Sequence, residues 1–315
     1  MSTLIEVRNL KKYFQTSHGD LHAVDDVSFT IEKGHTLGVV GESGCGKSTL
    51  GRTIIHLLES TDGQIFFEGE DVTRIKGKKL REFRENAQII FQDPYSSLNP
   101  RFTVRQTIVE PLALSKRFSK AELDKEADRI MELVGIDSRL ALAYPHELDG
   151  GRRQRVGIGR ALALNPKFIV CDEPVSALDV SIQAQVVNMF EDLQEKLGVA
   201  YLFIAHDLLV VHHISDRIAV MYLGHLMEMA TADELNAVPI HPYTQSLLSA
   251  VPVPDPETAR KSQRIVLEGD VPSPMNMPSG CPFRTRCRYA TEQCAKEMPP
   301  LTDRGGEHYV ACWNK

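Results

Sequence analysis

The chain has 315 residues, a formal net charge of −6 and a hydrophobic fraction of 42%, which suffices for one large soluble domain with an appended segment. The acidic balance argues against a nucleic-acid partner, because a nucleic-acid-binding surface needs clustered basic residues. No apolar stretch is long enough to span a bilayer and we expect no signal peptide, so any membrane association is expected to depend on partner subunits.

The N-terminal part is predicted to be rich in β-structure. Apolar and polar residues alternate in residues 5–10 and 23–31, and a turn is expected at residues 18–20. The apolar run at residues 36–40 then predicts a buried strand, and residues 50–58 have helical spacing.

A glycine-rich loop connects this strand to this helix. It fits the phosphate-loop pattern G-x-x-x-x-G-K-[ST] and consists of Gly41, Glu42, Ser43, Gly44, Cys45, Gly46, Lys47, Ser48 and Thr49. Glycines let the backbone turn with positive φ, and the helix start directs N–H groups and a favourable dipole at phosphate. We therefore predict ATP binding, with Lys47 on the β- and γ-phosphates and Ser48 on Mg²⁺. The alternative is an ordinary glycine turn before a helix.

The middle of the chain alternates between helices and strands. The predicted elements are a strand at residues 88–92, helices at 104–114, 120–134 and 152–164, a strand at 167–171, a helix at 181–197 and a strand at 199–205. This alternation predicts an α/β fold with a mainly parallel sheet, into which a charged helical segment is inserted.

Polar residues stand where several predicted strands end. Gln92, the pair Asp172 and Glu173, and His206 occupy such positions, and open α/β sheets bind ligands at the carboxyl ends of their strands. Asp172 suits Mg²⁺, and Glu173 could polarise the water that attacks the γ-phosphate. One histidine at a strand end is more often structural, but four polar residues together favour a catalytic site. Glu173, His206 and Gln92 are the predicted catalytic residues, and Ser48, Gln92 and Asp172 the predicted Mg²⁺ ligands.

The order and spacing of these motifs resemble the ATPase subunits of ABC transporters. The matching features are the phosphate loop, Gln92, the signature-like stretch from Leu148 to Arg152 with Asp149, Gly150 and Gly151, the Asp172–Glu173 pair, a loop ending at Asp179, and His206. The resemblance covers residues 1–235 and implies a P-loop NTPase fold with an N-terminal β-subdomain and a helical subdomain at about residues 94–160. It further implies that two cassettes bind head to tail with ATP between the phosphate loop of one and the signature of the other, contacted also by Asp179. Tyr13 would then stack on the adenine.

The signature-like stretch departs from the family pattern Leu-Ser-Gly-Gly-Gln. This chain has Asp149 where the family serine donates a hydrogen bond to the γ-phosphate, and an ionised carboxylate cannot donate. Aspartate is still a good helix N-cap, so we expect the fold to survive. One hypothesis is a weak ATP site at this signature and a heterodimer with an unlike ATPase. The alternative is that Arg152 or a shifted Asp149 rescues the contact.

Four cysteines lie in the proline-rich segment at residues 236–315, which is predicted to be a small irregular module. They are Cys281, Cys287, Cys294 and Cys312. Four thiolates suit a [4Fe–4S] cluster or zinc, but the spacing lacks the C-x₂₋₄-C pairs usual for zinc. The residues alone leave a cluster, zinc and free thiols open.

This C-terminal segment is similar to that of dipeptide and oligopeptide importer ATPases, through the stretches at residues 241–245, 272–274 and 278–287. That resemblance implies a [4Fe–4S] cluster on the four cysteines, with zinc as the second candidate. It also implies ATP-driven uptake of peptides or related small solutes, at the cytoplasmic face of the inner membrane. The implied partners are a second ABC ATPase, two transmembrane permease subunits and an extracytoplasmic solute-binding protein.

Three other functions stay open at this point. A soluble ABC ATPase would usually have two cassettes, coiled-coil insertions or a basic surface. An iron–sulfur sensor with a vestigial ATPase is disfavoured by intact Lys47, Asp172, Glu173 and His206. A phosphate-loop kinase is disfavoured by Glu173 and by the dimer motifs.

Overall fold

The structure is a computed structural model that describes residues 2–17, 19–116, 118–251 and 264–315. The chain divides into two compact units. The first contains residues 1–2, 32–35 and 74–202, and the second contains residues 3–31, 36–73 and 203–315. His18 of the predicted turn and residues 252–263 of the proline-rich segment lie outside the described residues.

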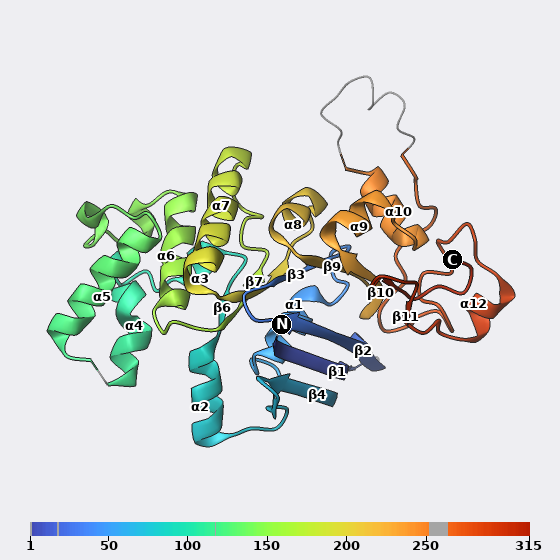
Figure 1. The fold of residues 1–315 in the computed structure, drawn as a ribbon, viewed down its shortest axis with the longest axis horizontal. Helices are drawn as coiled ribbons and strands as arrows, with labels where there is room; N and C mark the ends of the chain where they lie inside the picture. The colour runs from blue at the N-terminus through green and yellow to red at the C-terminus, as the bar shows by residue number, and fades with distance from the viewer. Residues whose placement is uncertain (1, 18, 117, 252–263) are drawn as a thin grey trace. The chain divides into compact units, whose positions relative to one another are not determined.

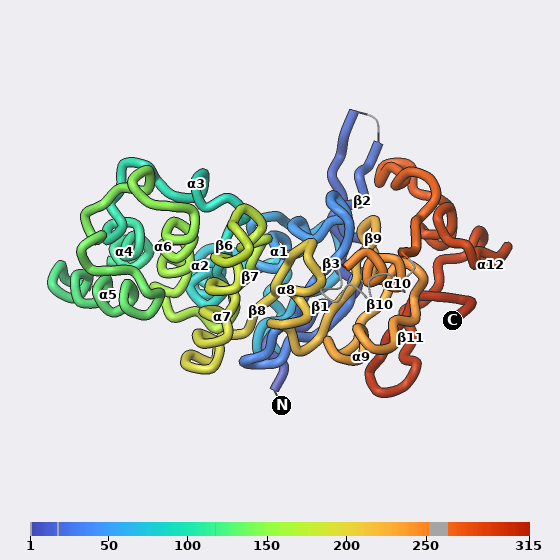
Figure 2. Tube along the Cα trace, turned by 90° about the horizontal axis from the view of Figure 1, so that it is seen from above, coloured from blue at the N-terminus to red at the C-terminus, as the bar shows by residue number. Residues whose placement is uncertain are grey.

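The second unit begins with a four-stranded sheet. Its strands lie in the order β2 (Gly19–Glu32), β1 (Thr3–Thr16), β4 (Asp62–Phe67) and β5 (Glu70–Asp71). Figure 2 shows β1 and β2 running beside each other. Val7 lies opposite Ile65 in the antiparallel pair of β1 and β4. Residues directly opposite each other share one face of a sheet, and both of these side chains are buried. The predicted β-rich N-terminal part is confirmed.

A second group of strands in this unit positions the phosphate loop. These strands are β3 (Thr36–Val40), β9 (Arg217–Tyr222), β10 (His225–Thr231), β11 (Thr302–Asp303) and β12 (Tyr309–Val310). β3 is parallel to β9, β9 is antiparallel to β10, and β12 pairs with both β10 and β11. Every residue of β3 is buried, as expected for the continuous apolar run of a central strand.

The helices of the second unit are short. They are α1 (Lys47–Ile54), α8 (Leu208–Ile214), α9 (Ala232–Ala237), α10 (Pro242–Ser249) and α12 (Glu292–Lys296). Beyond residue 236 the described chain has only α10, α12, β11 and β12 as regular elements. This agrees with the small amount of regular structure that its prolines predict.

The first unit contains the predicted parallel strands. β8 (Ala200–Ile204), β7 (Phe168–Asp172) and β6 (Ala87–Ile90) are neighbours in that order, and β6 runs parallel to β7 with Ala87 opposite Phe168. All residues of β7 and β8 are buried. The apolar runs that predicted these strands therefore form the interior of a parallel sheet.

Helices make up the rest of the first unit. They are α2 (Gly77–Asn86), α3 (Pro94–Ser97), α4 (Val104–Ser115), α5 (Lys120–Leu133), α6 (Gly150–Leu162) and α7 (Val180–Leu197), with 3-10 turns at Ser138–Leu140 and Pro145–Glu147. Helices α4, α5 and α6 pack against one another (Figure 1). Capping boxes at Thr103 and Ser119 start α4 and α5. Within the described ranges, no helix has the length and apolar character needed to cross a bilayer.

Candidate nucleotide-binding site

The phosphate loop between β3 and α1 requires glycine at two of its positions. Gly41, Gly44 and Gly46 have φ values of 154°, 77° and 103°, which favour glycine because a Cβ is strained there. A Cβ on Gly41 would lie 2.1 Å from the Met221 carbonyl oxygen, and one on Gly46 would lie 1.9 Å from that of Ala23. The close packing of this loop against neighbouring backbone therefore excludes any side chain at Gly41 and Gly46.

Lys47 begins α1 and is folded back over the loop. Its side chain is buried, and its Nζ donates to the carbonyl oxygens of Gly41 at 2.8 Å and Glu42 at 3.0 Å. The N-cap residue Gly46 makes no side-chain capping bond. A cation and a helix start without a side-chain cap thus lie on the same loop, the arrangement that binds phosphate at other helix N-termini.

The catalytic residues predicted in the first unit lie together. Gln92 Nε2 donates to Glu173 Oε2 at 2.9 Å. Glu173 follows β7 directly and has φ 49°, an uncommon conformation for a residue other than glycine and one that clusters at active sites. Asp172, at the end of the same strand, is fully buried. Two of the predicted strand-end residues, Gln92 and Glu173, are therefore within hydrogen-bond distance of each other.

Asp149 is the N-cap of α6, as expected. Its carboxylate accepts a hydrogen bond from the Arg152 backbone N–H at 2.8 Å and pairs with the Arg152 guanidinium at 3.4 Å. Gly151 follows on the first turn, where a Cβ would lie 2.6 Å from the Ile182 side chain. Asp149, in place of the serine of the signature pattern, therefore still caps α6 but adds a negative charge at the start of this helix.

The remaining predicted site residues, Tyr13, His206 and Asp179, belong to different elements of the chain. Tyr13 in β1 stacks on His22 with ring centroids 3.9 Å apart, and its hydroxyl donates to Asp25 at 2.6 Å. Burial, the Asp25 hydrogen bond and nearby acidic charges raise the pKa of Tyr13. His206 follows β8 and is exposed, and Asp179 is the exposed N-cap of α7. One face of the Tyr13 ring is therefore covered by His22.

The structure gives no support to the predicted metal site on the four C-terminal cysteines. Within the described residues, no group of three or more His, Cys, Asp or Glu side chains is placed to hold a metal ion. Burial, with a smaller effect from the other three thiols, raises the pKa of Cys281 to about 11. Burial acts to raise the pKa of Cys294, but hydrogen bonds from Thr291 and Asn314 lower it overall. The backbone N–H of Cys281 donates to the carbonyl oxygen of Cys294 at 2.8 Å, so these two cysteines lie close together.

Sequence reasoning missed two residues that contact the phosphate loop. Arg286 forms an ion pair with the Glu42 carboxylate at 2.8 Å, and the Tyr243 hydroxyl accepts a hydrogen bond from the Glu42 N–H at 2.9 Å. These contacts join residues more than 200 positions apart in the chain. Both residues lie in stretches that carry the resemblance to importer ATPases, at residues 241–245 and 278–287, but nothing in those stretches predicts a contact with Glu42.

The fold, the phosphate loop and the acidic pair after β7 define a phosphate-loop ATPase of the ABC class. Residues 24–176 match the ABC transporter family, and residues 227–294 match the C-terminal region of oligopeptide/dipeptide transporters. The chain is 27% identical to the dimeric ATP-binding cassette MJ0796 bound to ADP and Pi, with a TM-score of 0.67 over 73% of this chain and 99% of that one. For cbiO1 from Clostridium perfringens, part of the ABC transporter complex cbiONQ, the identity is 26% and the TM-score 0.68, over 76% and 92%.

Relatives that match over nearly the full chain identify the family within the ABC class. The chain is 52% identical to the oligopeptide transport ATP-binding protein AppF of Bacillus subtilis, over 98% of this chain and 97% of the relative. It is also 52% identical to the oligopeptide transport ATP-binding protein OppF of Haemophilus influenzae, over 98% and 93%. The chain therefore belongs to the family of ATP-binding proteins of oligopeptide and dipeptide ABC transporters.

Proposed function

We propose that this chain hydrolyses ATP at the cytoplasmic face of the cell membrane and so powers the import of peptides. The observation that carries this proposal is the hydrogen bond between Gln92 and Glu173 at the end of a buried strand. It holds a carboxylate where, in this family, a water is activated for attack on the γ-phosphate. Family membership and 52% identity to two oligopeptide transport proteins support peptides as the transported class.

The residues of the ATP site have distinct roles in this proposal. The phosphate-loop N–H groups and Lys47 bind the β- and γ-phosphates, and Tyr13 stacks on the adenine. Glu173 accepts a proton from the attacking water, while Gln92 and His206 orient the reacting groups. Ser48, Gln92 and Asp172 are the residues that would hold Mg²⁺, which neutralises charge on the phosphates. Asp179 and a signature from a second cassette complete the site.

The partners follow from the same proposal. Membership of the oligopeptide and dipeptide transporter family supports two permease subunits that form the pathway and an extracytoplasmic protein that delivers the peptide. The second ATPase is proposed to be an unlike chain, because Asp149 places a carboxylate where the family uses a serine hydroxyl donor.

The test measures ATP hydrolysis and peptide uptake by the assembled transporter in vesicles. Lys47→Ala is expected to abolish both, because it removes the cation that binds the phosphates. Lys78→Ala is the matched control, since Lys78 is 89% exposed and pairs only with Glu82 on α2. Uptake that continues without hydrolysis, or a complex that purifies with ribosomes or DNA rather than with membranes, would contradict the proposal.

A [4Fe–4S] cluster on Cys281, Cys287, Cys294 and Cys312 is a second proposal. Its support is the all-thiol donor set and the backbone hydrogen bond from the Cys281 N–H to the Cys294 carbonyl oxygen at 2.8 Å. Zinc would need sulfurs about 3.8 Å apart, given tetrahedral Zn–S bonds of about 2.3 Å.

Elemental analysis after anaerobic purification tests the cluster. We expect iron and acid-labile sulfide in equal amounts, lost in Cys294→Ser but kept in Cys171→Ala, which changes a buried thiol of β7. Colourless protein containing zinc, or containing no metal, would reject the proposal.

A further inference from the structure

Glu42, the second residue of the phosphate loop, has every one of its polar groups engaged. Its carbonyl oxygen accepts from Lys47 Nζ at 3.0 Å, and its N–H donates to the Tyr243 hydroxyl at 2.9 Å. Its two carboxylate oxygens accept from one guanidinium nitrogen of Arg286, at 3.1 Å and 2.8 Å. Glu42 therefore connects the lysine of the loop to two residues from elsewhere in the chain.

Both outside contacts come from the region that matches the C-terminal region of oligopeptide/dipeptide transporters. Tyr243 lies on α10, and Arg286 lies in the segment before α12. That region spans residues 227–294, whereas the match to the general ABC transporter family ends at residue 176. A region that matches only the oligopeptide/dipeptide transporter model therefore contacts the phosphate loop, which belongs to the general ABC transporter match.

These contacts are shielded from solvent and held rigidly. The Arg286 side chain is 9% exposed and that of Glu42 is 28% exposed, so solvent weakens their pairing less than at the surface. Tyr243 is fully buried; its ring packs edge-on against Tyr222, with centroids 4.8 Å apart, and in a tilted arrangement against Phe283, with centroids 5.4 Å apart. Tyr243 is consequently fixed by packing before any nucleotide binds, as residues that position a site need to be.

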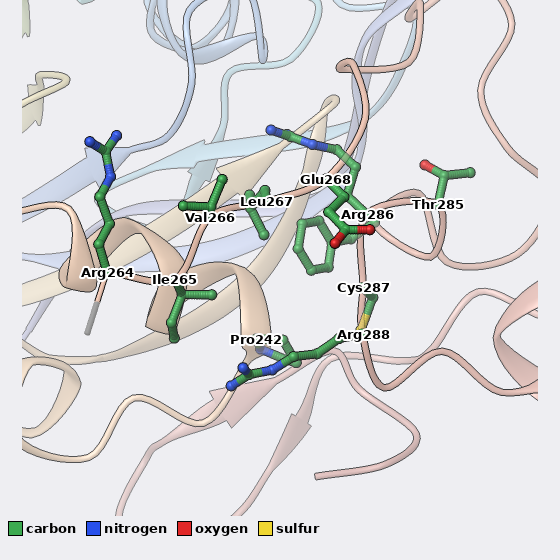
Figure 3. Close-up of a pocket in the computed structure, with 11 residues that line it drawn as sticks. Pro242, Arg264, Ile265, Val266, Leu267, Glu268, Thr285, Arg286, Cys287 and Arg288 are labelled. Carbon is green, nitrogen blue, oxygen red and sulfur yellow. The ribbon is translucent and has the colours of Figure 1, made fainter.

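Arg286 also adjoins one of the C-terminal cysteines. Figure 3 shows Arg286 and Cys287, consecutive residues along a pocket of about 400 Å³, with side chains that point in different directions. In the figure the Arg286 guanidinium extends away from the Cys287 sulfur. It pairs with the Glu42 carboxylate. Because Arg286 and Cys287 are consecutive, the position of the backbone at Cys287 also affects the position of Arg286.

We propose that Arg286 and Tyr243 are positioning residues for the phosphate loop. By holding Glu42 they fix the carbonyl oxygen that orients Lys47, and so keep the loop in the arrangement that receives ATP. This inference rests on the proposed ATP-binding function. It adds that the C-terminal region contributes to nucleotide affinity, in addition to any part it has in assembly.

Equilibrium binding of a fluorescent ATP analogue to the full chain, in complex with its partner subunits, tests this. Arg286→Ala is expected to weaken binding about tenfold or more, because a charge-assisted contact is lost and Glu42 is left unpaired. Tyr243→Phe removes only the hydroxyl and is expected to weaken binding about threefold. Arg288→Ala is the control: it removes the same charge two residues away, where the guanidinium lies over the Tyr289 ring instead.

Two further variants separate positioning from general stability. Arg286→Lys keeps the charge and is expected to recover part of the affinity. Glu42→Ala in the Arg286→Ala background is expected to add little, because both substitutions break the same contact. Unchanged or tighter binding in Arg286→Ala, or fully additive losses in the double variant, would overturn the inference. A wild-type chain that binds no ATP would instead refute the proposed function itself.

Discussion

At the scale of single residues, the backbone conformation and one hydrogen bond fix the direction of the Glu173 carboxylate. Glu173 leaves a buried strand in a left-handed conformation, with φ 49°, and accepts a hydrogen bond from Gln92. Such a conformation is costly outside glycine and persists where its surroundings enforce it. The carboxylate is therefore directed by the strand end and by one amide, rather than by its own preference.

The first prediction concerns Glu173→Gln. An amide cannot accept the proton of the attacking water, so we expect ATP hydrolysis to fall by a factor of about 10² to 10⁴ while ATP binding is retained. Hydrolysis rate and ATP affinity of the assembled transporter are the measurements. Glu195→Gln, an exposed position on α7, is the control. A hydrolysis rate close to that of wild type would remove Glu173 from the catalytic role.

The second prediction concerns Asp149→Ser. Two like charges about 4 Å apart repel by about 4 kcal/mol at an effective dielectric of about 20, and the Arg152 pair and solvent reduce this. Serine removes the charge, restores a hydroxyl donor and still caps α6, so we expect hydrolysis to rise about threefold to tenfold in the assembled transporter. If neither the rate nor the ATP affinity rises, the signature of this chain is not a weak one.

The residues that could be predicted from sequence are those whose roles are set by neighbours in the chain. Gly41, Gly46 and Lys47 form one continuous motif, and Glu173 follows a recognisable apolar strand. Arg286 and Tyr243 could not be predicted, because their contact with Glu42 joins segments that only the folded chain brings together. The four cysteines are the opposite case: ligand type alone predicts a cluster, whereas among the described residues no group of three or more potential ligands is placed to hold a metal ion.

At the scale of elements, α10 is stabilised by an unusual cap. His241 precedes it, is 1% exposed and accepts the Tyr243 N–H on Nδ1 at 3.1 Å. Burial lowers the pKa of His241 from 6.5 to about 3, so the imidazole stays neutral in the folded chain. Its backbone N–H donates to Glu228, which is itself fully buried and hydrogen-bonded to His308. The start of α10 is therefore tied to β10 and to the C-terminal segment.

The third prediction is a pH dependence from this cap. Below pH 6.5 the unfolded chain binds a proton on His241 that the folded chain excludes until about pH 3, so stability is full above 6.5 and falls as the pH drops. From pH 7.5 to 5.5 this group alone should cost about 1.4 kcal/mol. His241→Asn keeps a neutral cap and should lack that loss. Urea unfolding of both proteins at the two pH values measures the difference, and parallel curves would contradict it.

Element identity followed from sequence more closely than element pairing. The strands β3, β7 and β8 could be located from the sequence because each is a continuous apolar run bounded by polar residues. Pairing of β12 with β10 could not be predicted, since a strand of two residues has no periodicity of its own. Its position depends on contacts made by the rest of the tail, such as the bond from His308 to Glu228.

At the scale of the whole molecule, the proposal of an unlike partner ATPase rests on a single signature residue, Asp149. In this family each ATP site takes its phosphate loop from one cassette and its signature from the other. A pair of identical chains would place Asp149 at both sites, whereas a pair with an ATPase that has serine there would place it at only one. The unlike pair therefore brings half as many carboxylates toward bound nucleotide.

The fourth prediction follows from this difference. With ATP and Mg²⁺, the Glu173→Gln chain mixed with a family member whose signature has serine is expected to form a stable heterodimer, because hydrolysis no longer releases the nucleotide that joins the cassettes. Alone, the same chain is expected to remain largely monomeric at equal concentration. Size-exclusion chromatography with light scattering distinguishes the two species, and Lys47→Ala in the same background should abolish the heterodimer. Equally strong homodimers would show that Asp149 does not select an unlike partner.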